Sequence, residues 1–270
     1  MRTLATTTSL LLATLASSAS VFARSAPAAS PIQATTAADQ PTVVLVHGAW
    51  ADGSSWAKVI PLLQAKGIKV LAVQNPLTSL ADDVEATSRV LLDATGPVVL
   101  VGHSWAGTVI TEAGNDPKVK ALVYVAAFAN KEGQSGGDLV AAYPKTPALG
   151  TVWNDGHGFL RQTEQGMIDN FAADLPRAEA RTLFVTQGPL AASTFDDKVT
   201  KAAWRTVPSW YVVSANDRVV APQMERDLAA QMKAKTTVLQ SSHVSLLSHP
   251  KEIAAVIEDA VAAIAKSASK

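Results

Sequence analysis

Short apolar runs alternate with segments of helical periodicity along most of the chain after residue 41. The runs are rich in β-branched residues, and continuous apolar strands of this kind are typical of a parallel sheet covered on both faces. The expected strands are residues 42–46, 68–73, 98–101, 119–128, 210–214 and 236–240. We therefore predict an α/β fold with a mostly parallel, doubly wound sheet and helices on both faces.

The helical segments between these strands have apolar faces. The expected helices are residues 54–67, 80–94, the segment that follows Ser104, 222–233 and 250–265. In the second of them, one face is predicted to carry Leu80, Val84, Thr87 and Leu91, and the other Asp82, Glu85, Arg89 and Asp93. Pro61 lies inside the first helical pattern and predicts a kink or a restart there.

The regular alternation stops between residues 129 and 208. This stretch has scattered aromatic residues, frequent glycine and proline, and several short helical pieces. We interpret it as a cap inserted into a single domain of residues 41–270.

The first 23 residues differ in composition from the rest. Arg2 is followed by an uncharged segment rich in Leu, Ala, Ser and Thr, and Val21 and Ala23 lie three and one residues before a cleavage point. This pattern predicts a secretory signal peptide cut after Ala23, the alternatives being a disordered N-terminus or an uncleaved anchor. Residues 24–40 are interpreted as a flexible leader. The expected location is periplasmic or secreted, with no stable membrane anchor.

Composition limits the partners and the chemistry. The 270 residues are 48% hydrophobic, and Lys+Arg and Asp+Glu both total 23, so no charge excess favours nucleic acid or an anionic membrane surface. Cysteine is absent, so an exported protein would fold without disulfides and without a lipid-modified cysteine. The expected partner is a small-molecule substrate, and the oligomeric state is left open.

A candidate nucleophile follows the third predicted strand. Residues 98–101 lead directly into Gly102-His103-Ser104-Trp105-Ala106-Gly107. A sharp strand-to-helix turn of this type lifts a serine hydroxyl above the sheet edge, at a helix N-terminus with free N–H groups. The strict pattern has glycine two residues after the serine, where this chain has Ala106.

Ser104 needs a base, and the base needs an acid. His243 and Asp217 each follow a late predicted strand, so both should reach the sheet edge where Ser104 lies. Their order along the chain, Ser104, Asp217, His243, is the one expected for this type of fold. The less favoured histidines are His47, His103, His157 and His249, and the less favoured acids are Asp155, Asp196 and Asp197. For Asp217 the alternative is a turn residue that is paired with Arg218 or caps the next helix.

The segment His47-Gly48-Ala49-Trp50 follows the first predicted strand. An acyl-transfer intermediate carries an oxyanion that needs backbone N–H donors already in place. We expect these donors to be the N–H groups of Ala49 and Trp105.

Four segments, taken in order along the chain, resemble segments of α/β-hydrolases. They are His47 to Trp50, Gly102 to Gly107, Ser214 to Arg218 and Ser241 to His243. They most resemble the small serine esterases that include plant methylesterases and hydroxynitrile-lyase-like proteins. The resemblance covers about residues 41–265 and implies an eight-strand-type sheet, a triad without a cofactor or metal, and a pocket roofed by the cap.

Residue types at three positions decide among the reactions of this fold. The resemblance implies an aspartate nucleophile in epoxide hydrolases and haloalkane dehalogenases, and in the lyases a lysine after the catalytic histidine and a threonine in the oxyanion loop. This chain has Ser104, Val244 and Gly48 there.

We therefore predict a serine esterase that cleaves small to medium uncharged carboxylic esters through an acyl-enzyme. The predicted substrate-binding residues are Trp50, Phe128 and Trp153. Core or cap packing is the alternative for the tryptophans. Thioesterase, lactonase, C–C hydrolase and perhydrolase activities would use the same triad, and a ligand-binding protein with slow turnover is a further alternative.

Overall fold

The computed structural model describes residues 40–268. The predicted signal peptide and almost all of the predicted leader lie outside this range. Within it, no helix is both long enough and apolar enough to cross a membrane.

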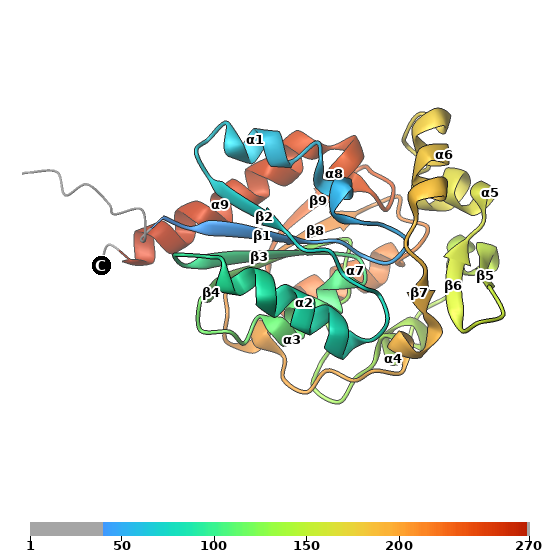
Figure 1. The fold of residues 1–270 in the computed structure, drawn as a ribbon, viewed down its shortest axis with the longest axis horizontal. Helices are drawn as coiled ribbons and strands as arrows, with labels where there is room; N and C mark the ends of the chain where they lie inside the picture. Colours follow the sequence, from blue (N-terminus) through green and yellow to red (C-terminus); the bar gives the residue numbers. More distant parts are fainter. Residues whose placement is uncertain (1–39, 269–270) are drawn as a thin grey trace, which may run out of the picture. The chain divides into compact units, whose positions relative to one another are not determined.

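The main sheet has six strands in the order β2-β1-β3-β4-β8-β9, and every pairing is parallel (Figure 1). Their bounds are β1 Thr42–Val46, β2 Lys69–Ala72, β3 Val98–His103, β4 Val119–Val125, β8 Ser209–Ser214 and β9 Lys235–Leu239. All six predicted strands are present, so the α/β fold with a parallel sheet is confirmed. The expectation of an eight-strand-type sheet is wrong, because the main sheet has six strands among the described residues, with β2 and β9 at its edges.

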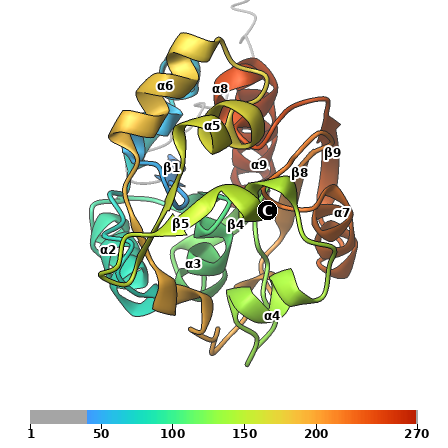
Figure 2. The same cartoon turned by 90° about the vertical axis from the view of Figure 1, so that its right-hand side faces the viewer.

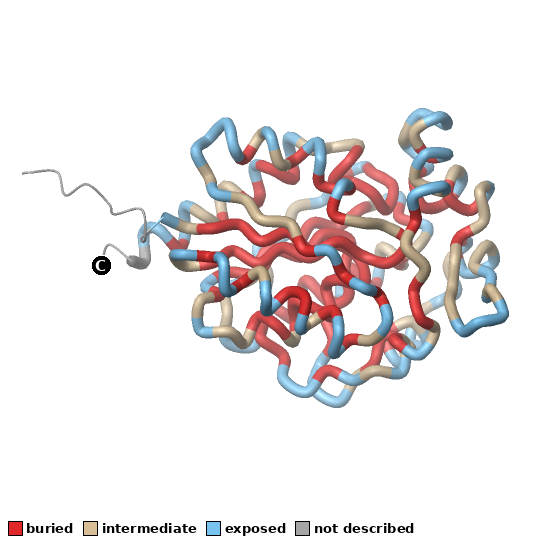
Figure 3. Tube along the Cα trace, viewed as in Figure 1, coloured by how far each residue is buried: buried red, intermediate tan, exposed pale blue. Residues whose placement is uncertain are grey.

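Helices cover both faces of the sheet. α1 (Ile60–Gln64) and α9 (Pro250–Ala268) lie on one side in Figure 1, and α2 (Leu80–Leu92) and α3 (Ala106–Ala113) on the other. α7 (Pro222–Gln231) packs against β8. Central strands β1, β3 and β4 are buried along almost their whole length, as Figure 3 shows, because both their faces are covered.

Backbone geometry corrects two local predictions, and one short helix was missed. The helix predicted over residues 54–67 is a 3-10 turn, Gly53–Trp56, followed by α1, in which Pro61 lies in the first turn where its missing N–H is not needed. Strand β4 stops at Val125 rather than residue 128, because Ala126 turns the chain at φ +45°. The short helix α8 (Ser245–Ser248) was not predicted.

The segment between β4 and β8, here called the insertion, carries its own small elements. It contains α4 (Gly136–Ala141), β5 (Val152–Asn154), β6 (Phe159–Gln162), α5 (Glu164–Gly166), α6 (Arg177–Thr186) and β7 (Leu190–Ala191), with short 3-10 and π turns between them. Strands β5, β6 and β7 form a separate antiparallel sheet. Figures 1 and 2 place the insertion beyond the carboxyl ends of the main strands.

The position of the candidate site follows from this topology. The chain runs from β1 outward to β2 and then returns to β3 on the other side of β1. In open α/β sheets, ligands bind outside the carboxyl ends of the strands at such a switch point. Ser104 follows directly on β3, and the insertion faces the same edge.

Candidate active site

Ser104 lies at a sharp turn between β3 and α3. Its φ angle is +57°, a left-handed conformation that is strained for a residue with a side chain. The Ser104 carbonyl accepts hydrogen bonds from the Gly107 N–H (2.9 Å) and the Phe128 N–H (3.1 Å), which hold the turn in this shape. The hydroxyl is thereby presented at the N-terminus of α3.

A hydroxyl, an imidazole and a carboxylate meet at this point. His243 Nε2 lies 2.8 Å from Ser104 Oγ, and His243 Nδ1 lies 2.6 Å from Asp217 Oδ2. All three residues are buried. With the ring proton on Nδ1 donated to Asp217, Nε2 is left free to accept the Ser104 proton, as a serine nucleophile requires.

The carboxylate of Asp217 is itself fixed. Its Oδ1 accepts the N–H groups of Val219 (2.6 Å) and Val220 (3.0 Å), which leaves Oδ2 for His243. The alternative pairing with Arg218 does not occur, since the Arg218 guanidinium donates to the Asp169 carbonyl instead.

The loop after β1 lies against Ser104. A Cβ placed on Gly48 would come within 2.8 Å of both the His103 carbonyl oxygen and Ser104 Cβ, so only glycine fits this close approach. The N–H groups of Ala49 and Trp105 have no hydrogen-bond acceptor among the described residues. Free, buried donors on the two loops that flank Ser104 are what an oxyanion site requires.

The glycine that allows close packing of α3 is Gly107, three residues after Ser104, whereas the strict pattern has glycine two residues after the serine. Ala106 is fully buried, and its methyl group is accommodated. A Cβ on Gly107 would instead meet the Phe128 carbonyl oxygen at 2.0 Å. The tight contact of α3 with the strand end therefore depends on Gly107.

The other histidines have structural positions. His47 Nδ1 donates to the Gly48 carbonyl, and its Nε2 accepts the Asn75 N–H, so His47 holds the loop that follows β1. Burial lowers the pKa of His47. His103 donates from Nε2 to the His243 carbonyl at 3.0 Å, and the centroids of the two rings lie 4.6 Å apart. His157 is exposed on the insertion, and His249 ends α8.

Of the predicted substrate-binding residues, Trp50 and Phe128 are connected to residues of the site by hydrogen bonds or ring contacts, whereas Trp153 has no such contact among the described residues. Trp50 donates its indole N–H to the Leu160 carbonyl of the insertion. The backbone N–H of Phe128 bonds to Ser104. Trp153 is 46% exposed on β5, where it pairs with Arg161.

Two residues of the insertion that contact the site were missed. Phe171 lies edge-on to the His243 ring, with 5.1 Å between ring centroids, and it also contacts Trp50 at 6.3 Å. Asp174 accepts the Ser242 N–H at 2.8 Å and so holds the loop that carries His243. Neither lies in a recognisable motif, because both reach the site through the path of the insertion.

A buried carboxylate supports Trp105 from behind. Asp83 on α2 is fully buried, although the helix pattern did not place it inward. Its two oxygens accept the Leu77 N–H and the Trp105 indole N–H, both at 2.8 Å. Burial raises the pKa of Asp83 to about 6. Asp83 therefore links α2 to the residue that follows Ser104.

This raised pKa predicts a pH-dependent stability. A carboxyl group whose pKa is about 6 in the folded state and 3.8 otherwise binds more protons when folded, so the free energy of unfolding falls as pH rises through this window. Between about pH 4.5 and 7.5 the loss amounts to about 2 kcal/mol. Urea unfolding at both pH values measures the free energy of unfolding of the wild type and of Asp83→Asn. Between the lower and the higher pH, this free energy should fall by about 2 kcal/mol less in the variant than in the wild type. An equal fall in the unfolding free energy of both proteins would contradict the raised pKa of Asp83.

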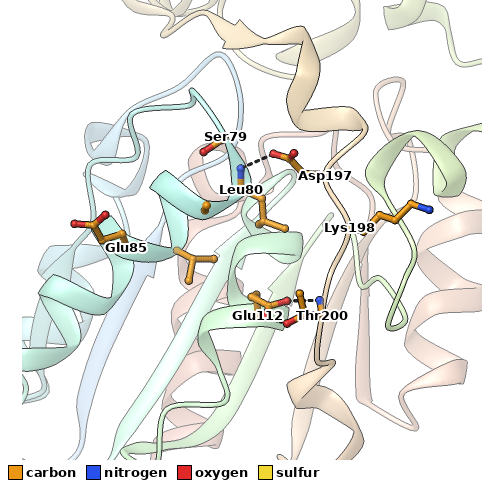
Figure 4. Close-up of a pocket in the computed structure, with 9 residues that line it drawn as sticks. Ser79, Leu80, Glu85, Glu112, Asp197, Lys198 and Thr200 are labelled. Carbon is orange, nitrogen blue, oxygen red and sulfur yellow. Dashed lines mark hydrogen bonds between the residues drawn. The ribbon is translucent and has the colours of Figure 1, made fainter.

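A cavity of about 440 Å³ lies elsewhere, between α2, α3 and residues 197–200 (Figure 4). Two of the carboxylates around it are engaged, because Asp197 accepts the Leu80 N–H and Glu112 accepts the Thr200 N–H. The residues that line the cavity do not include Ser104, Asp217 or His243, nor any residue of the loop 47–50 that follows β1. It is therefore not the candidate active site.

The parallel sheet, the serine turn after β3 and the hydrogen-bonded histidine and aspartate together define a hydrolase site of the α/β type. The chain belongs to the alpha/beta hydrolase family, whose sequence pattern matches residues 43–256.

Two relatives and one solved structure illustrate the similarity. A pyrethroid hydrolase of Sphingobium wenxiniae is 27% identical over 247 residues, which cover 80% of this chain and 86% of the relative. Salicylic acid-binding protein 2 of Nicotiana tabacum is 38% identical over 102 residues, or 32% of this chain and 38% of the relative. A methylesterase from Arabidopsis has the same fold, with a TM-score of 0.67 and 21% identity, covering 83% of this chain and 99% of that one. The predicted resemblance to methylesterase-like hydrolases is confirmed, and the chain is a hydrolytic enzyme.

Proposed function

We propose that the protein is a serine esterase that hydrolyses small to medium uncharged carboxylic esters through an acyl-enzyme. The observation that carries the proposal is the continuous chain of contacts from Asp217 to His243 to Ser104 Oγ. The pyrethroid hydrolase among the relatives supports hydrolysis as the reaction type.

The reaction follows from these positions. His243 Nε2 accepts the Ser104 proton as Oγ attacks the ester carbonyl carbon, and the Ala49 and Trp105 N–H groups stabilise the oxyanion. His243 then donates that proton to the departing alcohol, which leaves an acyl group on Ser104. A water molecule, deprotonated by His243, attacks the acyl carbon and regenerates the free hydroxyl.

Aromatic rings next to His243 favour an apolar substrate. Phe171 lies against the His243 ring, Trp50 lies against Phe171, and Phe128 is buried beside the Ser104 turn. Sites lined by aromatic side chains with few polar groups bind uncharged, apolar parts of ligands. These rings support the proposed preference for uncharged esters.

The same geometry argues against cyanohydrin cleavage. The residue after His243 is Val244, which is buried and offers no cation for a departing cyanide. The oxyanion loop has Gly48, where a threonine side chain would overlap His103 and Ser104. The two residue types that the resemblance implies for lyases are thus absent here.

Active-site labelling tests the proposal. A fluorophosphonate probe should modify the protein in a single position, and peptide mapping should identify Ser104 as the modified residue. Labelling should be lost when Asp217 or His243 is replaced, because the serine then loses its base. A probe adduct on another serine, or none on Ser104, would refute the proposed nucleophile.

Localisation is a separate proposal. The composition of residues 1–23 supports export to the periplasm or the medium, and mass spectrometry of the protein recovered from its native host should show an N-terminus at Arg24.

A further inference from the structure

A second carboxyl group is buried next to Asp217. Glu225, on α7, is fully buried, and its Oε2 accepts the Ser214 N–H at 2.8 Å. Its Oε1 is buried and has no hydrogen-bond partner among the described residues. Ser214 connects the two acids, because its N–H donates to Glu225 and its carbonyl accepts the Asp217 N–H at 3.1 Å. The charge of Asp217 and a hydrogen bond with its side chain are both among the causes that raise the pKa of Glu225. Two carboxylates in such contact inside a protein cannot both keep their charge at low cost.

The groups around Glu225 determine which of the two carries the proton. Asp217 accepts two backbone N–H groups on Oδ1, and its Oδ2 faces His243 Nδ1. Glu225 has one backbone donor, Ser214 N–H.

The other titratable neighbours are Tyr211 on β8 and Arg226 on α7. The Tyr211 hydroxyl donates to the Ala127 carbonyl. Burial, and then the charge of Asp217, raise the pKa of Glu225 well above its ordinary value, while Ser214 N–H and Arg226 act in the opposite direction. Burial and the charge of Asp217 therefore both favour the neutral form of the Glu225 carboxyl group.

We propose that Glu225 is a positioning residue of this site, whose neutral carboxyl group donates a hydrogen bond to the Asp217 carboxylate and holds it toward His243. This inference rests on the proposed function, because it assigns Glu225 a part in the same hydrolytic site. The bond gives the otherwise unpaired Oε1 a partner. It also adds a side-chain donor from α7 to the two backbone donors of Asp217.

The conservative variant separates this role from simple packing. In Glu225→Gln, the amide can still donate to Asp217 and accept from Ser214, so kcat should stay within about threefold of the wild type. In Glu225→Ala the donor is lost, and kcat should fall by about 10- to 100-fold with KM little changed. Glu252→Gln, the same chemical change at an exposed position on α9, should have no effect.

A spectroscopic measurement tests the protonation directly. The infrared difference spectrum between the wild type and Glu225→Gln at neutral pH should contain the carbonyl band of a protonated carboxylic acid. Glu252→Gln should give no such band. Thermal unfolding of each variant shows whether a loss of activity reflects loss of the fold.

Two results would overturn the inference. One is a difference spectrum with only carboxylate bands, which would show that Glu225 is charged. The other is a folded Glu225→Ala variant with the kcat of the wild type. Failure of this inference can be distinguished from failure of the proposed function. If the wild type showed no Ser104-dependent hydrolysis, the proposed function would fail, but the infrared spectrum would still report whether Glu225 is protonated.

Discussion

Replacement of Ser104 with alanine is expected to lower kcat for ester hydrolysis by about five to six orders of magnitude. The variant lacks the only oxygen within reach of His243 Nε2 that can attack the substrate carbonyl in the described structure. Residual hydrolysis would come from the oxyanion donors and from substrate binding, which leave some catalysis when a triad residue is removed. Hydrolysis of p-nitrophenyl acetate by equal amounts of the two proteins measures the loss.

A matched control is Ser54→Ala, which makes the same change at an exposed serine and should keep full activity. The Ser104 variant should unfold at a temperature close to that of the wild type, because it loses one hydroxyl group. Equal hydrolysis by the wild type and the Ser104 variant would contradict the proposed mechanism. It would favour the alternative of a ligand-binding protein.

Asp217→Asn is expected to lower kcat by about four orders of magnitude while the fold is kept. The two N–H donors of Val219 and Val220 require an oxygen, so the amide nitrogen in this variant would face His243. Two donors cannot face each other, and His243 would therefore carry its proton on Nε2. In that tautomer it cannot accept the proton of Ser104.

The measurements are kcat, KM and the free energy of unfolding, with Asp93→Asn as an exposed control. If Asp217 were only a turn residue, its replacement would alter the unfolding free energy and leave kcat unchanged. That result would remove Asp217 from the mechanism and leave Ser104 and His243 without a third member.

Local pattern predicted the elements that lie in the main sheet and its covering helices. β1 was placed with its observed bounds, and the restart at Pro61 was found because proline constrains the backbone wherever it occurs. The predicted end of strand β4 was too late, because the chain turns at Ala126 with a positive φ, and alanine is not a residue type that indicates such a turn. The short helix α8 was missed because four residues give too little periodicity to recognise.

The sequence by itself determined the α/β fold, the positions of the strands along the chain and the candidates Ser104, Asp217 and His243. Each of these three residues follows a strand in a short motif. Only the tertiary structure decided which side chains support them. Phe171 and Asp174 reach the site through the path of the insertion, and Trp153 is half-exposed on β5. Asp83 and Glu225 look like ordinary helix acids in the sequence, and their burial beside Trp105 and Asp217 comes from packing between segments far apart in the chain. The physical reason is that a strand or a turn depends on neighbouring residues, whereas the ionisation and contacts of a buried group depend on everything packed around it.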